Sequence, residues 1–142
     1  MNRPNDRFQS IAPEEIEVGK AYTLTINPEK VTGDLVSDYK HIKKIVQGYS
    51  HIRHLEMKLF PEYSKFGKLH AHGTFKCNDV EAIVRFYEHM PALKKEATFK
   101  IDHLKTERVS EKYETWAQYC LKNKHLMKPV LNNRGLHYAI TP

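Results

Sequence analysis

The sequence lacks any long apolar run: no stretch approaches the ~20 consecutive apolar residues that a membrane-spanning helix needs. Its first seven residues are polar and lack the apolar core of a secretion signal. Cysteine is scarce, since only Cys77 and Cys120 are present and neither belongs to a Cys-x-x-Cys pattern. These absences predict a soluble intracellular protein with free thiols rather than a disulfide or zinc framework.

Signals of nucleotide hydrolysis and of disorder are missing as well. No Gly-x4-Gly-Lys-Ser/Thr phosphate loop occurs, so the sequence predicts no helicase ATPase within this chain. There is no internal repeat, no low-complexity tract and no block of like charges. The 142 residues, 40% of them hydrophobic, therefore predict one compact domain with a real core.

Negative charge is in the minority. The chain has 23 Lys and Arg against 17 Asp and Glu, a formal net charge of +6. A basic excess favours polyanionic partners such as nucleic acid. Because the excess is dispersed along the chain, it predicts a groove on a folded surface rather than a basic tail.

Alternating apolar and polar residues predict four strands, at 20–26, 52–60, 68–75 and 97–104. Helical spacing predicts helices from Thr32 or Asp34 to 47, from Asn78 or Asp79 to 89, and from 110 to 123. Residues 61–67 are predicted to form a turn that joins two antiparallel strands. This order predicts an α+β, ferredoxin-like split β-α-β fold: an antiparallel sheet with helices on one face, extended by a C-terminal helix.

The predicted boundaries are a loose N-terminal arm over 1–18, a domain over 19–128 and a tail over 129–142 that adds an edge strand or lies loosely. The arm is polar and contains two prolines, which disfavour regular structure. Helical spacing in the second predicted helix indicates a buried stripe made of Val80, Ile83, Val84 and Tyr87.

Two histidines one residue apart, His70 and His72, lie in the third predicted strand. Successive side chains of a strand point to opposite faces, so both imidazoles lie on the same side of the sheet. The same alternation directs Leu69, Ala71 and Phe75 to the other, apolar side. Two imidazoles on one face can bind one metal ion, although a polar sheet surface without a metal shows the same pattern.

A carboxylate beside the two histidines would complete a site for a divalent cation with open positions. Glu62 precedes His70 across the predicted turn, which could return its carboxylate to the histidines. Glu56 is the alternative, because alternation puts it on the same face of the preceding strand. We expect Glu62 to be the ligand, since a residue at the strand end is nearer the pair in a tight hairpin.

The last predicted helix carries a tyrosine that could act as a nucleophile. Tyr119 and Lys122 share a flank of this helix outside the apolar stripe. A nearby cation or metal favours the phenolate form, and a lysine three residues on lies on the right face to help. The residues of the predicted buried stripe are Val109, Tyr113, Trp116 and Cys120.

Together these motifs resemble the HUH endonuclease domain of rolling-circle replication initiators, the Rep proteins of small circular single-stranded DNA viruses and related plasmids. Residues 24–28, Leu-Thr-Ile-Asn-Pro, look like the first motif of that family. The segment from Glu62 to His72 looks like its metal motif, and residues 119–122, Tyr-Cys-Leu-Lys, look like its Tyr-x-x-Lys motif. The first motif departs from the pattern at Leu24, where an aromatic is common, and at Pro28, where a second Asn often stands.

The resemblance implies a metal-dependent single-stranded DNA endonuclease and strand transferase with one catalytic tyrosine. Glu62, His70 and His72 would hold Mn²⁺ or Mg²⁺, Tyr119 would form a 5′-phosphotyrosine, and Lys122 would assist. The implied partner is an origin hairpin in single-stranded DNA, and a helicase domain often follows in such proteins. The implied location is the host nucleus for a eukaryotic virus and the cytoplasm for a bacterial or plasmid protein. Candidate DNA contacts on the polar sheet face are Thr25, Asn27, Lys58, Lys65 and Lys68.

Two other interpretations stay open at this point. A ferredoxin-like nucleic-acid-binding module without catalysis would present the same histidines and lysines on its sheet. A relaxase or transposase of the HUH group would use the same metal motif.

Overall fold

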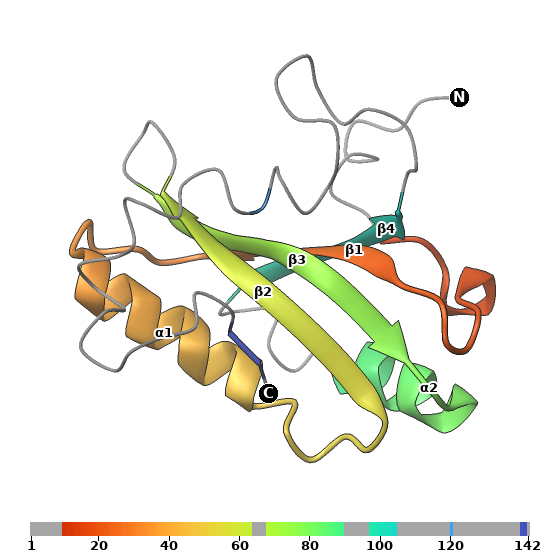
Figure 1. The fold of residues 1–142 in the computed structure, drawn as a ribbon. Helices are drawn as coiled ribbons and strands as arrows, with labels where there is room; N and C mark the ends of the chain where they lie inside the picture. Colours follow the sequence, from red (N-terminus) through yellow and green to blue (C-terminus); the bar gives the residue numbers. More distant parts are fainter. Residues whose placement is uncertain (1–9, 64–67, 90–96, 105–119, 121–139, 142) are drawn as a thin grey trace.

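The computed structural model describes residues 10–63, 68–89, 97–104, 120 and 140–141 (Figure 1). The described elements are a short 3-10 helix, η2 (Pro13–Glu15), and then β1 (Tyr22–Pro28), α1 (Leu35–Gln47), β2 (Leu55–Tyr63), β3 (Leu69–Cys77), α2 (Val80–His89) and β4 (Ala97–His103). No helix within these residues is long and apolar enough to cross a membrane. The four strands lie within three residues of their predicted positions.

The strands form one antiparallel sheet in the order β2-β3-β1-β4. α1 links β1 to β2 with β3 between them, and α2 links β3 to β4 with β1 between them. Figure 1 shows both helices on the same side of the sheet. The predicted α+β class is thus confirmed, and the arrangement is compatible with a ferredoxin-like split fold.

The core lies between the helices and one face of the sheet. Alternate residues of β1 and β3 are buried, as in Leu24 and Ile26 of β1, while the residues between them are partly exposed. The ring of Phe75 in β3 packs against that of Phe86 in α2, with centroids 4.6 Å apart. We call the opposite, polar side of the sheet the open face. Its side chains on the three strands nearest the histidines are Thr23, Thr25, Asn27, Glu56, Lys58, Phe60, Glu62, His70, His72, Thr74 and Lys76.

α1 begins and ends where the sequence predicts. Asp34 caps its first turn, because its carboxylate accepts a hydrogen bond of 3.0 Å from the Ser37 amide. Hydrogen bonds from the Ser37 hydroxyl and from its amide to the ionised carboxylate also lower the pKa of Asp34. The helix ends at Gln47, directly before Gly48.

The buried stripe predicted for α2 is wrong in part. Val80 and Val84 are 63% and 46% exposed, whereas the helix buries Ala82, Ile83 and Phe86. The predicted and the observed buried residues of α2 both have helical spacing, so spacing alone allows either face of the helix to pack on the sheet. Burying the large Phe86 ring against the sheet removes more apolar area from water than burying a valine, which favours the observed rotation.

The segment 10–18, predicted to be a loose arm, is packed along β4 and α2. The Ile11 amide donates to the Ile101 carbonyl at 3.0 Å, and the Tyr87 hydroxyl donates to the Ile11 carbonyl at 2.7 Å. Ile16 is buried in the core. Packing of the apolar residues Ile11 and Ile16 against the core orders this segment despite its polar composition. Residues 1–9 lie outside the described part.

β2 continues through Pro61 and Glu62, where the sequence predicts a turn. Proline lacks an N–H and is tolerated on edge strands, and β2 is an edge of the four-stranded ladder. Leu59 directs its N–H and its carbonyl to Ile140, away from β3. Pro61, two residues on, has the same orientation, so the N–H that it lacks would not have bonded to β3.

The C-terminal elements are described only at isolated residues. Ile140 pairs with Leu59 through hydrogen bonds of 3.0 and 2.6 Å. Cys120 is buried and helical, within the helix predicted over 110–123. The other residues of that helix and of the tail lie outside the described part, including Tyr119 and Lys122.

One buried hydroxyl predicts a gain in stability when it is removed. Tyr49 is fully buried beside Phe86, and its hydroxyl has no hydrogen-bond partner among the described residues. An unsatisfied buried polar group costs ~1–3 kcal/mol, and burial also raises the pKa of this phenol well above its usual range. Tyr49→Phe should therefore increase the free energy of unfolding by about 1 kcal/mol in urea denaturation.

Tyr87→Phe is the matched control, because the Tyr87 hydroxyl is bonded to the Ile11 carbonyl. Its loss should lower the free energy of unfolding by about 1 kcal/mol. Equal losses in both variants would show that the Tyr49 hydroxyl has a partner.

Candidate metal centre

The three predicted ligands meet on the open face near one end of the β2–β3 hairpin. Glu62 lies directly opposite His70 in the antiparallel register, and His72 follows two residues later on the same face. Glu62 is therefore brought to the histidines by strand pairing rather than by a turn, and the predicted location in a turn is wrong. Its identity as the neighbouring acid agrees with the prediction.

Their polar atoms converge on one point. The Glu62 Oε2 atom lies 2.7 Å from His72 Nε2 and 3.3 Å from His70 Nε2, and the two Nε2 atoms are 2.8 Å apart. One ligand atom from each of the three residues lies within 4.8 Å of the others. Their side chains are only 13–17% exposed, so solvent reaches the group from a limited direction.

The donor set fits a divalent cation. Ligands held ~2.1 Å from a metal at right angles stand about 3 Å apart, close to the separations in this group. Two imidazoles and one carboxylate suit Mn²⁺, Zn²⁺ and other borderline cations and also accept Mg²⁺. Three ligands from one side leave the remaining coordination positions to water or substrate.

Glu56, the alternative acid, has a different neighbour. It lies opposite Lys76 in the register, and its carboxylate pairs with the Lys76 ammonium at 3.0 Å. It is separated from Glu62 by six residues of β2, about 20 Å of extended chain. The structure thus brings Glu62, and not Glu56, to the histidines.

Thr25 adds a contact that sequence analysis missed. It is the register partner of His72 on β1, and its Oγ1 atom lies 3.0 Å from His72 Nδ1. The sequence places Thr25 on the open face, where we predicted a DNA contact. No sequence signal reveals that β1 and β3 pair in the register that puts this hydroxyl on the imidazole.

The structure describes some of the other predicted DNA contacts and not others. Asn27 and Lys58 are exposed on the open face, and Lys68 is exposed directly before β3. Lys65 lies outside the described residues, as do Tyr119 and Lys122, so the geometry of the predicted nucleophile is not described. Lys100 of β4, opposite Thr25 in the register, is a further cation that the sequence analysis did not select.

Neither cysteine offers an alternative nucleophile. Cys77 and Cys120 are both buried free thiols. Burial, reinforced by the nearby Asp79 carboxylate, raises the pKa of Cys77 to about 12. A thiol with such a pKa holds almost no thiolate at neutral pH.

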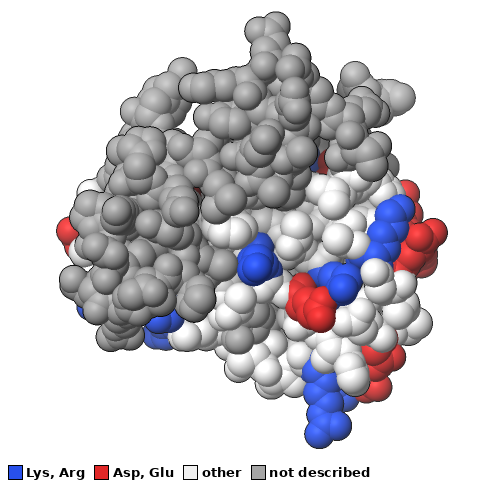
Figure 2. Space-filling model, in the orientation of Figure 1, with Lys and Arg blue, Asp and Glu red and all other residues white. Residues whose placement is uncertain are grey.

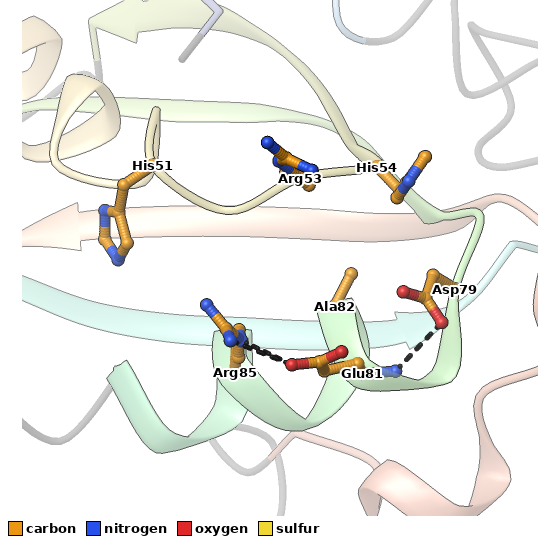
Figure 3. A pocket seen from close by; sticks show the side chains of 7 residues that line it. All are labelled: His51, Arg53, His54, Asp79, Glu81, Ala82 and Arg85. Carbon is orange, nitrogen blue, oxygen red and sulfur yellow. Dashed lines mark hydrogen bonds and ion pairs between the residues drawn. The ribbon is translucent and has the colours of Figure 1, made fainter.

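A separate cavity of about 360 Å³ lies at the other end of the hairpin, between residues 51–54 and the start of α2 (Figure 3). Three of its charged side chains already have partners: Arg85 pairs with Glu81 at 2.8 Å, and the Asp79 carboxylate accepts a hydrogen bond from the Glu81 amide at 3.3 Å. His54, at its rim, has a left-handed φ of 62°. The His, Asp and Glu side chains that line this cavity do not form a group that could hold a metal ion.

The described surface carries both signs of charge. Figure 2 shows Lys and Arg side chains interspersed with Asp and Glu over the described part of the side in view. On that part, the basic side chains are not gathered into one patch. The Glu62–His70–His72 group is consequently the most specific feature of the described residues.

No protein-family model, curated protein or solved structure matches this chain.

Proposed function

We propose that this protein is a rolling-circle replication initiator of the HUH type, which nicks and rejoins single-stranded DNA at an origin. The observation that carries the proposal is the convergence of Glu62, His70 and His72 on one face of an antiparallel sheet. The sequence supplies Tyr119 and Lys122 in the spacing that the family uses. The open face beside the metal centre would carry the DNA strand.

In this function the chain holds a cation and delivers a nucleophile. Glu62, His70 and His72 would hold Mn²⁺ or Mg²⁺, which would supply Lewis-acid polarisation of the scissile phosphate. The Tyr119 hydroxyl loses its proton and attacks phosphorus, the bond to the 3′ oxygen breaks, and that oxygen gains a proton. The products are a 5′-phosphotyrosine and a free 3′-hydroxyl, and Lys122 offsets charge on the phosphate or positions the tyrosine.

Rejoining is the same exchange in reverse. The phosphotyrosine is a phosphodiester, so little bond energy is lost in forming it. A later 3′-hydroxyl attacks that phosphorus, restores the DNA backbone and releases the Tyr119 phenol, without ATP. One tyrosine is sufficient for this cycle, and no second tyrosine lies four residues from Tyr119.

The DNA would lie across the open face. Asn27, Lys58 and Lys68 are exposed there and can bond to phosphates or bases, and we assign Lys65 to the same path. The substrate is a single strand presented by an origin hairpin. The four-stranded antiparallel sheet suits this role because one of its faces carries no described helix.

The test is covalent capture of DNA. The full chain is incubated with Mn²⁺ and a pool of random single-stranded oligonucleotides that carry a fluorophore at the 3′ end, and is then denatured in SDS. The 5′-phosphotyrosine keeps the 3′ fragment, so a fluorescent protein band is expected. Tyr119→Phe should abolish this band, because it removes the attacking oxygen while DNA binding is retained.

Tyr113→Phe is the matched control, since Tyr113 belongs to the stripe predicted to be buried. It should leave the adduct intact. An adduct that persists in Tyr119→Phe would refute the assigned nucleophile.

The second candidate is a nucleic-acid-binding module without catalysis. A four-stranded antiparallel sheet with helices on one side and a polar open face is also the architecture of single-strand RNA-binding modules. That function predicts binding that is unchanged by EDTA, and no covalent product from the wild-type chain. A relaxase or transposase of the HUH group would form the adduct and would differ in the DNA that it selects.

A further inference from the structure

We propose that Thr25 is a positioning residue for the metal centre, which holds the His72 ring so that Nε2 faces Glu62 and His70. This inference rests on the proposed metal centre. Its observation is the 3.0 Å contact between Thr25 Oγ1 and His72 Nδ1. The other ring nitrogen of His72 is the atom that lies 2.7 Å from the Glu62 carboxylate.

The donor and acceptor roles follow from the chemistry of imidazole. A neutral ring carries one N–H and one lone pair, on different nitrogens. When Nε2 gives its lone pair to a cation, the hydrogen must be on Nδ1, and the Thr25 hydroxyl accepts a hydrogen bond from it. The hydroxyl is thus compatible with the tautomer that can bind metal, and the contact fixes the rotation of the ring.

The position of Thr25 makes this contact rigid. It is in the middle of β1, paired on one side with His72 and on the other with Lys100. Branching at Cβ restricts its χ1 angle, so the hydroxyl is not free to sample many directions. A half-buried hydroxyl bonded to a ring nitrogen is less available for a DNA phosphate than the exposed side chains nearby.

Thr23 provides a matched control on the same strand and the same face. Its Oγ1 donates to the Asp102 carbonyl at 3.2 Å, so it is a threonine with a backbone partner and no metal ligand. Thr25→Val and Thr23→Val remove the same atom at positions two residues apart. Both replace threonine with a residue of similar shape that favours strands.

The test measures Mn²⁺ affinity by the electron paramagnetic resonance of free Mn²⁺. Loss of a partner that orients a ligating histidine typically weakens metal binding by 10–100-fold, so Thr25→Val should weaken it by at least about tenfold. Thr25→Ser restores the hydroxyl and should stay within about threefold of the wild type. The Mn²⁺ affinity of Thr23→Val should also stay within about threefold of the wild type. Circular dichroism establishes that each variant is folded.

A second readout reports the contact between Thr25 and the His72 ring directly. In protein loaded with diamagnetic Zn²⁺, ¹H–¹⁵N spectra follow the exchange of the His72 Nδ1 proton with water. This proton should exchange slowly in the wild type and in Thr25→Ser, where the hydroxyl accepts its hydrogen bond, and faster in Thr25→Val. A role of Thr25 in packing alone would leave this exchange rate unchanged.

The outcomes separate the competing roles. Unchanged Mn²⁺ affinity in Thr25→Val, with weaker binding of an oligonucleotide in EDTA, would overturn the inference and make Thr25 a DNA contact. Failure of the wild type to bind Mn²⁺ would refute the metal centre and this inference together. Normal Mn²⁺ binding without a covalent adduct would contradict only the nicking function, and the comparison of Thr25 variants would still decide the role of Thr25.

Discussion

Glu62→Gln should reduce Mn²⁺ affinity by more than about 100-fold, beyond the range caused by losing an outer partner of a ligand. The substitution keeps the shape of the side chain and removes the negative charge between His70 and His72. An amide oxygen is a weaker ligand for a divalent cation than a carboxylate, and two imidazoles alone form an incomplete site. Isothermal titration calorimetry measures the loss of Mn²⁺ affinity.

Glu56→Gln is the control for this substitution. It removes the same charge from the same strand, but the Glu56 carboxylate pairs with Lys76 on the exposed surface. Exposed pairs contribute at most about 1 kcal/mol, so both metal affinity and stability should change little. The reverse pattern, with affinity lost in Glu56→Gln and kept in Glu62→Gln, would refute the ligand set.

Gly73→Ala should lower the free energy of unfolding by about 3 kcal/mol, the upper end of the cost of overpacking. Gly73 lies opposite Leu59 in a pair that makes no hydrogen bonds between the two strands, where antiparallel backbones come closest. An added Cβ would collide with the Lys58 carbonyl and stand 2.7 Å from Leu59 Cα. These are backbone atoms, so the clash cannot be relieved by a change of rotamer and β2 must move away from β3.

Urea denaturation with and without Mn²⁺ measures both consequences of this substitution. Moving β2 also moves Glu62 away from the histidines on β3, so the stabilisation by Mn²⁺ should shrink in Gly73→Ala. Gly48→Ala is the comparison, because its added Cβ would meet the Ile45 carbonyl at 3.1 Å, a much smaller conflict. Similar stability of Gly73→Ala and the wild type would show that β2 adapts without cost.

The sequence predicts the parts of this molecule that depend on local patterns. Alternation correctly places His70 and His72 on the face opposite Leu69 and Ala71, because the direction of a strand side chain depends only on its position along the strand. The cap at Asp34 is predicted for the same reason, since it depends on a few neighbouring residues.

The parts that the sequence does not predict depend on tertiary contacts. The rotation of α2 follows from Phe86 packing on Phe75, and periodicity allows more than one face to be buried. The continuation of β2 through Pro61 follows from its place at the edge of the sheet, which local sequence does not reveal. The contact of Thr25 with His72 depends on the β1–β3 register in the same way.

The three proposed ligands and the proposed positioning residue come from different parts of the chain. Glu62, His70 and His72 belong to one hairpin, so bringing them together closes a short loop at a modest cost in chain entropy. Thr25 lies 47 residues from His72 and joins the group only when β1 pairs with β3. During folding, a hairpin could therefore gather the ligands early, while the orientation of His72 is fixed only once the sheet is complete. In the proposed metal centre, the gathering of the ligands is thus a local property of the hairpin, and the orientation of His72 is a property of the whole fold.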